Sequence, residues 1–296
     1  MSAALFPDNF KHERLLVNEV SIHVRHGGLG PPLLLVHGYP QTMAMWHLVA
    51  GQLAKHFHVV CVDLRGYGDS AKPESTATHE PYSKRAMAKD LHAVMMQLGY
   101  ESFAVAGHDR GARVAHRMAL DFAPSITKVC VMDIAPTHHM FATTDQAFAT
   151  AYYHWFFLIQ PDGLPEKMIG QDPEFYLREK LNRWSAPGAQ FNEQAVAEYI
   201  RCFSNEDTIH ASCEDYRAAA SIDLHHDEAD MHCKIECPLL VLWGQHGFVG
   251  RQYDVLAVWQ QRATQVQGCT VNSGHFLPEE APEEVVQRLT QFLLHA

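Results

Sequence analysis

The stretch Gly107-His108-Asp109-Arg110-Gly111 places one carboxylate between two glycines. The apolar run 103–106 before it predicts a buried strand, and from Ala112 apolar residues recur at helical spacing. Small residues are needed at a sharp strand-to-helix turn, because larger side chains would collide there. Such a turn exposes its central residue beside the free N–H groups of the helix, which favour an ionised carboxylate. We therefore interpret Asp109 as a nucleophile; an N-cap aspartate before an ordinary helix is the alternative.

An aspartate nucleophile implies a hydrolysis in two steps. The carboxylate attacks a carbon without the help of a base and becomes an ester. Water must then cleave the ester, and that water needs a base. The rest of the chain should therefore supply a base, an acid that orients the base, and a pocket for the leaving group.

The candidate base is His275, which lies in the loop Gly274-His275-Phe276 between the last predicted strand and the last predicted helix. A surface histidine is the alternative, because the chain has 21 histidines. A histidine base needs a carboxylate that fixes its tautomer and stabilises the imidazolium. The segment 243–247, after the penultimate strand, contains no acid. Asp133, at the end of the strand that follows the elbow, is therefore the favoured partner, and Asp254, inside a predicted helix, is the second choice.

The pattern of apolar runs predicts the elements that position these residues. Strands alternate with helices, which predicts an α/β fold with a mostly parallel sheet flanked by helices. The predicted segments are strands over 14–25, 33–36, 59–62, 103–106, 128–134, 238–243 and 266–271, and helices over 45–54, 82–98, 253–261 and 282–294. Ligands bind at the carboxyl ends of such strands. His37, Asp63, Asp109 and Asp133 all follow predicted strands, so we expect several of them at one edge.

Residues 137–223 break this alternation, because they are rich in aromatic residues and contain no clear strand. We interpret them as a helical cap, with a helix over 193–203, inserted into a core formed by residues 1–136 and 224–296. Dimerisation through the apolar cap is compatible with this composition. The following segment 225–237 is rich in His, Asp, Glu and Cys, but its spacing matches no familiar zinc pattern. A solvated linker is the favoured interpretation, and we expect neither a metal nor a cofactor.

Composition restricts the class of partner. The net charge of −11 over 296 residues argues against nucleic acid. Seven cysteines without a Cys-x-x-Cys pair predict reduced thiols in a cytoplasmic protein. The N-terminal segment lacks the pattern of a signal peptide, and no apolar run reaches the length of a membrane span. We therefore expect a small-molecule substrate, with no membrane partner.

The motifs together resemble the α/β-hydrolase superfamily along nearly the whole chain, and within it the fluoroacetate (haloacetate) dehalogenases. The elbow and the histidine loop are typical of the superfamily, whereas the paired arginines and the cap motifs are more specific. The matching segments are 37–40, 63–70, 107–113, 133–137, 154–155, 213–218 and 273–276. The family differs from this chain at Tyr39, where phenylalanine is common, and near Met140, where some members carry a polar aromatic residue.

The resemblance implies an α/β-hydrolase fold, hydrolysis of a haloacetate through an aspartyl ester, and a role for each matching residue. Asp109 is the nucleophile, His275 the base and Asp133 its partner. The substrate carboxylate binds Arg110 and Arg113, the halide binds His154, Trp155 and Tyr216, the backbone N–H groups of Tyr39 and Arg110 form the oxyanion hole, and Trp184 lies near the pocket. No cofactor is implied.

The physical chemistry of the residues agrees with a small anionic substrate. A planar guanidinium suits bidentate binding of a carboxylate. Indole, phenol and imidazole donors can replace the water that a departing fluoride loses. Each group also has a simpler interpretation. Arg110 and Arg113 could balance the charge of Asp109 or form surface ion pairs, and His154 and Trp155 could be part of the packed core of the cap.

Three other functions are compatible with the same fold. A soluble epoxide hydrolase has the same nucleophile but needs cap tyrosines, for which Tyr152, Tyr153 and Tyr216 are available. Paired arginines argue against it, and against a haloalkane dehalogenase, because two buried charges beside a neutral substrate are costly. A non-catalytic ligand receptor is the third, and a complete set of nucleophile, base and acid argues against it.

Overall fold

The computed structural model describes residues 5–294 and contains an eight-stranded sheet in the order β1-β2-β4-β3-β5-β6-β7-β8. A hairpin of β1 and β2 pairs antiparallel with β4, and all later strands pair in parallel. The mostly parallel sheet predicted from the sequence is confirmed. The strands are β1 (Lys11–Val17), β2 (Val20–Gly27), β3 (Pro32–Val36), β4 (His58–Val62), β5 (Phe103–His108), β6 (Ile126–Met132), β7 (Leu239–Gly244) and β8 (Val266–Val271).

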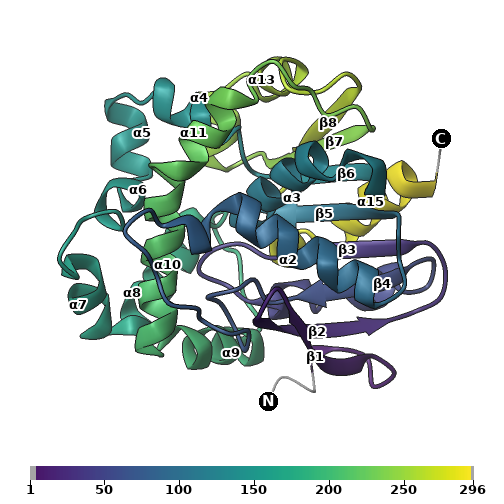
Figure 1. Cartoon of the computed structure of the whole chain (residues 1–296), viewed down its shortest axis with the longest axis horizontal. Helices are drawn as coiled ribbons and strands as arrows, with labels where there is room; N and C mark the ends of the chain where they lie inside the picture. Colours follow the sequence, from purple (N-terminus) through teal and green to yellow (C-terminus); the bar gives the residue numbers. More distant parts are fainter. Residues whose placement is uncertain (1–4, 295–296) are drawn as a thin grey trace.

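Helices cover both faces of the sheet (Figure 1). Helices α2 (Lys84–Gln97) and α3 (Arg110–Asp121) lie in front of it, whereas α15 (Pro282–Leu294) lies behind it. The central strand β5 is buried along its whole length. A strand covered on both sides must be apolar at every position, which explains why β3, β4 and β5 appear in the sequence as continuous apolar runs.

Between β6 and β7 the chain forms helices only, which we call the insert helices. They lie on the left side of Figure 1, next to the carboxyl ends of the strands. Their bounds are α4 (Thr137–Ala142), α5 (Gln146–Ala151), α6 (His154–Phe157), α7 (Leu164–Gly170), α8 (Pro173–Trp184), α9 (Glu193–Phe203), α10 (Glu206–Ala219) and α11 (Ile222–Ala229). The helix expected over 193–203 has these same bounds.

The last insert helix corrects one expectation. The sequence predicts a solvated linker from His225 onward, but the first residues of this segment belong to α11. Asp223 explains this order: its buried carboxylate accepts the Lys84 N–H at the start of α2, at 2.8 Å. This contact fixes α11 against the core. Over residues 5–294, no three His, Cys, Asp or Glu side chains are grouped so that they could hold a metal ion.

Two predicted helices differ in detail from the structure. The helix expected over 45–54 is a 3-10 turn, η2 (Met43–Trp46), followed by a short α1 (Ala50–Leu53). The helix expected over 253–261 corresponds to α13 (Val255–Gln260), and a separate short helix, α12 (Phe248–Gln252), precedes it. Asp254 sets the start of α13, because its side chain accepts the Ala257 N–H. Asp254 is therefore a capping residue and no partner for His275.

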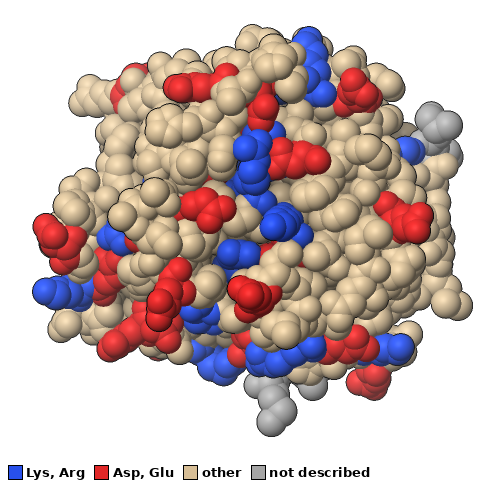
Figure 2. All heavy atoms as spheres, viewed as in Figure 1, with Lys and Arg blue, Asp and Glu red and all other residues tan. Residues whose placement is uncertain are grey.

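On the face shown in Figure 2, Lys and Arg lie beside Asp and Glu, and large areas are uncharged. None of the described helices has the length and apolar character that crossing a membrane requires. The seven cysteines are unpaired, as expected, and four of them are buried: Cys61, Cys130, Cys202 and Cys213.

The elbow between β5 and α3 requires its glycines for the reason the sequence suggested. A Cβ on Gly107 would lie 2.4 Å from the carbonyl oxygen of Gly111. A Cβ on Gly111 would lie 2.3 Å from the carbonyl oxygen of His37. Backbone, not flexible side chains, occupies both positions, so a methyl group can be accommodated only by moving the elbow.

The structure predicts that Gly107→Ala destabilises the protein by about 1–3 kcal/mol, the typical effect of overpacking a core. Chemical unfolding followed by circular dichroism measures this change. Gly170→Ala is the matched control, because a Cβ there has no neighbour within 4 Å, and alanine favours the helix by up to about 1 kcal/mol. Equal midpoints for the two variants would contradict the close packing at the elbow.

Candidate active site

Asp109 sits at the elbow between β5 and α3 in a backbone conformation that non-glycine residues rarely adopt, with φ 47° and ψ −115°. Such strain is found where a side chain must be presented in one fixed direction. The carboxylate makes no capping hydrogen bond to α3, so it does not act as an N-cap. Its Oδ1 instead accepts the Tyr39 N–H at 2.9 Å. The residue is 8% exposed, so the carboxylate is nearly enclosed.

His275 and Asp133 complete a line of three side chains. His275 Nδ1 lies 2.6 Å from Asp133 Oδ2, and its Nε2 lies 3.9 Å from Asp109 Oδ2. The other oxygen of Asp133 accepts the Gly244 N–H at 3.0 Å, which ties β6 to β7 at this point. Nε2 has no hydrogen-bond partner among the described residues. A water molecule bound to Nε2 would therefore lie against the carboxylate carbon of Asp109.

Burial and charge act in opposite directions on this pair. Burial raises the pKa of the Asp109 carboxyl, but the positive charges of His275, Arg110 and Arg113 outweigh burial and bring that pKa below its ordinary value. Burial lowers the pKa of His275, but its hydrogen bond to Asp133 and the charges of Asp133 and Asp109 bring that pKa above 6.5. Asp109 is thus ionised near neutral pH, as a nucleophile must be.

Two further contacts hold the histidine loop. His108 Nε2 donates to the carbonyl oxygen of His275 at 2.7 Å, and burial lowers the pKa of His108 to about 3, so the ring stays neutral. Glu279, four residues after His275, accepts from the Tyr199 hydroxyl at 2.9 Å and from the Gln41 amide. Burial raises the pKa of Glu279 to about 8. Glu279 thereby joins the histidine loop, the loop after β3 and helix α9.

Arg110 is held by a residue that the sequence analysis did not assign to it. Its Nε lies 3.0 Å from Asp215 Oδ2, and its Nη2 lies 2.6 Å from Asp215 Oδ1. The Tyr67 hydroxyl and the Lys84 ammonium also donate to this carboxylate. Asp215 thus occupies the Nε–Nη2 edge of Arg110, so a substrate carboxylate cannot bind bidentately there, and binding of substrate by Arg110 stays a prediction. Only Nη1 has no partner among the described residues.

Arg113 lies one turn further along α3 and is also partly engaged. Its Nη1 donates to the carbonyl oxygen of Ala135 at 3.0 Å and to the Thr137 hydroxyl at 2.9 Å. Its Nη2 lies 3.2 Å from the sulfur of Met140. Nε has no partner among the described residues. Each arginine is thus fixed in place and retains one unused donor.

The residues expected to bind halide lie around these arginines. Arg110 packs over the ring of Tyr216 at 4.1 Å, and Arg113 packs over the ring of Trp155 at 4.8 Å. The His154 ring lies 5.5 Å from Tyr216. All three expected residues are buried. Among the buried atoms without a partner in the described structure are three near these arginines: Tyr216 Oη, His154 Nδ1 and Trp184 Nε1.

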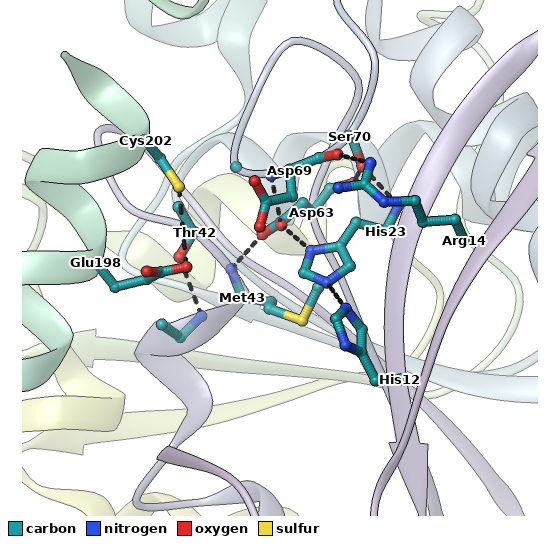
Figure 3. Close-up of polar contacts among 12 residues, drawn as sticks. His12, Arg14, His23, Thr42, Met43, Asp63, Asp69, Ser70, Glu198 and Cys202 are labelled. Atoms are coloured by element: carbon teal, nitrogen blue, oxygen red, sulfur yellow. Dashed lines mark hydrogen bonds and ion pairs between the residues drawn. The ribbon is translucent and has the colours of Figure 1, made fainter. Parts of the chain in front are cut away.

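Two of the predicted strand-end residues have structural roles. Buried His37 accepts the Leu64 N–H at 3.1 Å and donates to the carbonyl oxygen of Gly38. Asp63 binds His23 Nδ1 at 2.6 Å and the Met43 N–H at 2.8 Å (Figure 3). Asp63 therefore fixes the start of η2 to β2 and lies outside the line of Asp109, His275 and Asp133.

A pocket of 640 Å³ opens between the insert helices and the core and reaches His275. Trp184 lines this pocket and packs across the ring of His275, with ring centres 5.4 Å apart. The pocket thus provides a route from solvent to the base, and Asp109 is not among its lining residues.

The fold and the site define the class of protein. A family model described as alpha/beta hydrolase fold matches residues 31–282, and the chain belongs to this family. It is a hydrolase. It is 41% identical to a fluoroacetate dehalogenase of Burkholderia sp., over 98% of this chain and 95% of that protein.

Other relatives differ in what they are described to do. A soluble epoxide hydrolase of Corynebacterium sp. (strain C12) is 32% identical, over 95% of this chain and 96% of that protein. The crystal structure of an α/β hydrolase from Nostoc sp. PCC 7120 superposes with a TM-score of 0.97 at 59% identity, covering 98% of this chain and 99% of the other.

The buried ion pair predicts a stability effect. Asp215→Asn removes the charge that compensates Arg110 and Lys84, and breaking one partner of a buried pair costs about 3–5 kcal/mol. The pKa of Asp215 is depressed, so this stability is present above the unfolded pKa of the carboxyl and is lost as the pH falls below it. Urea unfolding at neutral and acidic pH measures both effects.

Asp162→Asn is the matched control for this substitution. Asp162 is exposed and has φ 60°, a conformation that asparagine also tolerates. We expect the control to change stability by less than about 0.5 kcal/mol. A loss in Asp215→Asn no larger than in the control would show that the buried pair contributes little.

Proposed function

We propose that the protein hydrolyses a haloacetate to glycolate and halide through an ester on Asp109. The observation that carries this proposal is a buried, ionised carboxylate surrounded by fixed donors that lack partners. Arg110 Nη1 and Arg113 Nε are charged donors of this kind, and Tyr216 Oη and His154 Nδ1 are neutral ones. Buried donors normally have a partner, so a group of them around one carboxylate indicates a site for an anionic ligand.

In the first step the substrate carboxylate binds one unused donor of each arginine. An oxygen of Asp109 attacks the α carbon as the carbon–halogen bond breaks, and the halide leaves with the electron pair. Tyr216, His154 and Trp155 surround the leaving group, and donors there stabilise the charge as it develops. Burial keeps competing water away from a strongly hydrated anion such as fluoride.

In the second step His275 Nε2 takes a proton from water, and the water oxygen attacks the carboxyl carbon of Asp109. The Tyr39 N–H already donates to Oδ1, so it can stabilise the oxyanion of the tetrahedral intermediate together with the N–H of Arg110. The ester bond then breaks, and the departing glycolate oxygen receives the proton from His275. Asp133 stabilises the imidazolium between these transfers.

An epoxide hydrolase is the second candidate, favoured by the identity of 32% to the Corynebacterium enzyme. The hydroxyl of buried Tyr216 and that of Tyr152 could donate to an epoxide oxygen. Halide release from fluoro-, chloro- and bromoacetate, compared with diol formation from styrene oxide, separates the two functions. We expect halide release; diol formation without halide release would overturn the proposal.

The ester intermediate gives a second test. In His275→Asn the first step remains, but the base for the second step is lost, so turnover should fall by about 10²–10⁴-fold. Mass spectrometry after one turnover should find a carboxymethyl group on Asp109. His246→Asn is the control, because His246 lies on the exposed side of the pocket, and it should turn over without accumulating an adduct. Absence of the adduct from His275→Asn would contradict the two-step mechanism.

The rate of ester hydrolysis should depend on pH through His275. The ring must be neutral to accept a proton, and its pKa lies above 6.5. The rate should therefore fall by roughly tenfold per pH unit below that pKa. Asp133→Asn removes the negative charge that helps to raise this pKa, so the acid limb should move to lower pH while the maximal rate decreases. Rapid-quench measurement of ester decay tests this, and an unmoved limb would exclude the role of Asp133.

A further inference from the structure

The pocket that reaches His275 has an unusual balance of charge. Two of its lining residues are arginines, Arg183 at the end of α8 and Arg251 in α12, and two are histidines, His246 and His275. No aspartate or glutamate lines it. The whole chain carries a net charge of −11, so a cavity without carboxylates differs in sign from its surroundings.

The nearest charges outside the pocket do not cancel both arginines. Arg183 Nη1 lies 3.6 Å from Glu179, a half-exposed pair, and such pairs are weak in water. Asp145 is occupied by the N–H of Phe148 and by Gln252. Arg251 is exposed and forms no ion pair with any residue between 5 and 294. At least one cation at this opening is therefore uncompensated.

From this geometry we propose that Arg183 and Arg251 form a positively charged entrance that recruits small carboxylate anions. The identity of the anion rests on the proposed function. The existence of a positively charged entrance does not depend on that function. A cleft lined by one sign of charge focuses its field and raises the local concentration of the opposite ion. The overall negative charge would otherwise slow the approach of an anion. The arginines act on association and not on bond breaking, because they lie on the solvent side of His275.

Fluorescence quenching tests the entrance without any turnover. Trp46, Trp155 and Trp259 are at most 1% exposed, so Trp184 and Trp243 are the accessible indoles. The difference between the parent protein and Trp184→Phe isolates the signal of Trp184. In Arg183→Gln/Arg251→Gln we expect quenching of Trp184 by iodide to fall about threefold or more, as loss of two nearby charges in water predicts. Quenching by neutral acrylamide should not change.

Arg178→Gln is the matched control, because Arg178 lies on the same helix α8 but outside the pocket. It should leave iodide quenching unchanged, and melting curves should show that all variants remain folded. The proposal that Arg183 and Arg251 recruit anions is refuted if iodide quenching falls equally in the control. It is also refuted if quenching does not fall in the double variant.

Steady-state kinetics then link the entrance to the substrate. In the double variant kcat/KM for a haloacetate should fall and lose most of its dependence on salt, whereas kcat stays unchanged. Reduced iodide quenching in a protein that releases no halide would support the entrance and refute the proposed function. Halide release with unchanged kcat/KM and unchanged quenching would refute the entrance and leave the proposed function intact.

Discussion

The structure around the site depends on keeping one buried carboxylate ionised. Enclosure of Asp109 favours the neutral acid, and only fixed positive groups and an N–H donor offset that preference. Flexible side chains would be less effective, because the entropy lost when they become ordered would offset much of the favourable electrostatic free energy. The backbone segments around the site therefore pack directly against one another, and glycines stand where these segments meet. The segments are the elbow, the start of α3 and the histidine loop.

Two side chains near Asp109 are each held by a carboxylate from a distant part of the chain. Asp133 orients His275, and Asp215 orients Arg110. Glu279 fixes the loop that carries His275 to the loop that carries Tyr39. These three supporting carboxyl groups hold the residues around Asp109 in one orientation before any ligand binds. Such preorganisation is a main source of electrostatic catalysis. It also explains why so many charged groups in this protein are buried.

The sequence predicted those features of the site that depend on residues close together in the chain. The alternation of strands and helices fixed which residues follow strands, and the absence of an acid in 243–247 pointed to Asp133. The pattern could not reveal the Asp215–Arg110 pair, because 105 residues separate its partners and nothing in either neighbourhood specifies the other. Asp63 followed a strand as predicted, yet its neighbour His23 on β2 directs it into a structural contact. Strand ends are thus predictable, whereas partners across the fold are not.

The balance of charge through the reaction favours a haloacetate over a neutral epoxide. Burial and the charge of Arg110 both lower the pKa of Arg113. Asp109 makes the largest contribution in the opposite direction and so favours the charged guanidinium. Formation of any ester neutralises Asp109 and removes that support. A haloacetate brings its own carboxylate, which stays on the ester and continues to face the arginines until glycolate leaves. An epoxide brings no such charge, so Arg113 would be buried without a compensating anion in the ester intermediate, which is costly. The two arginines are therefore better suited to a substrate whose negative charge survives the first step.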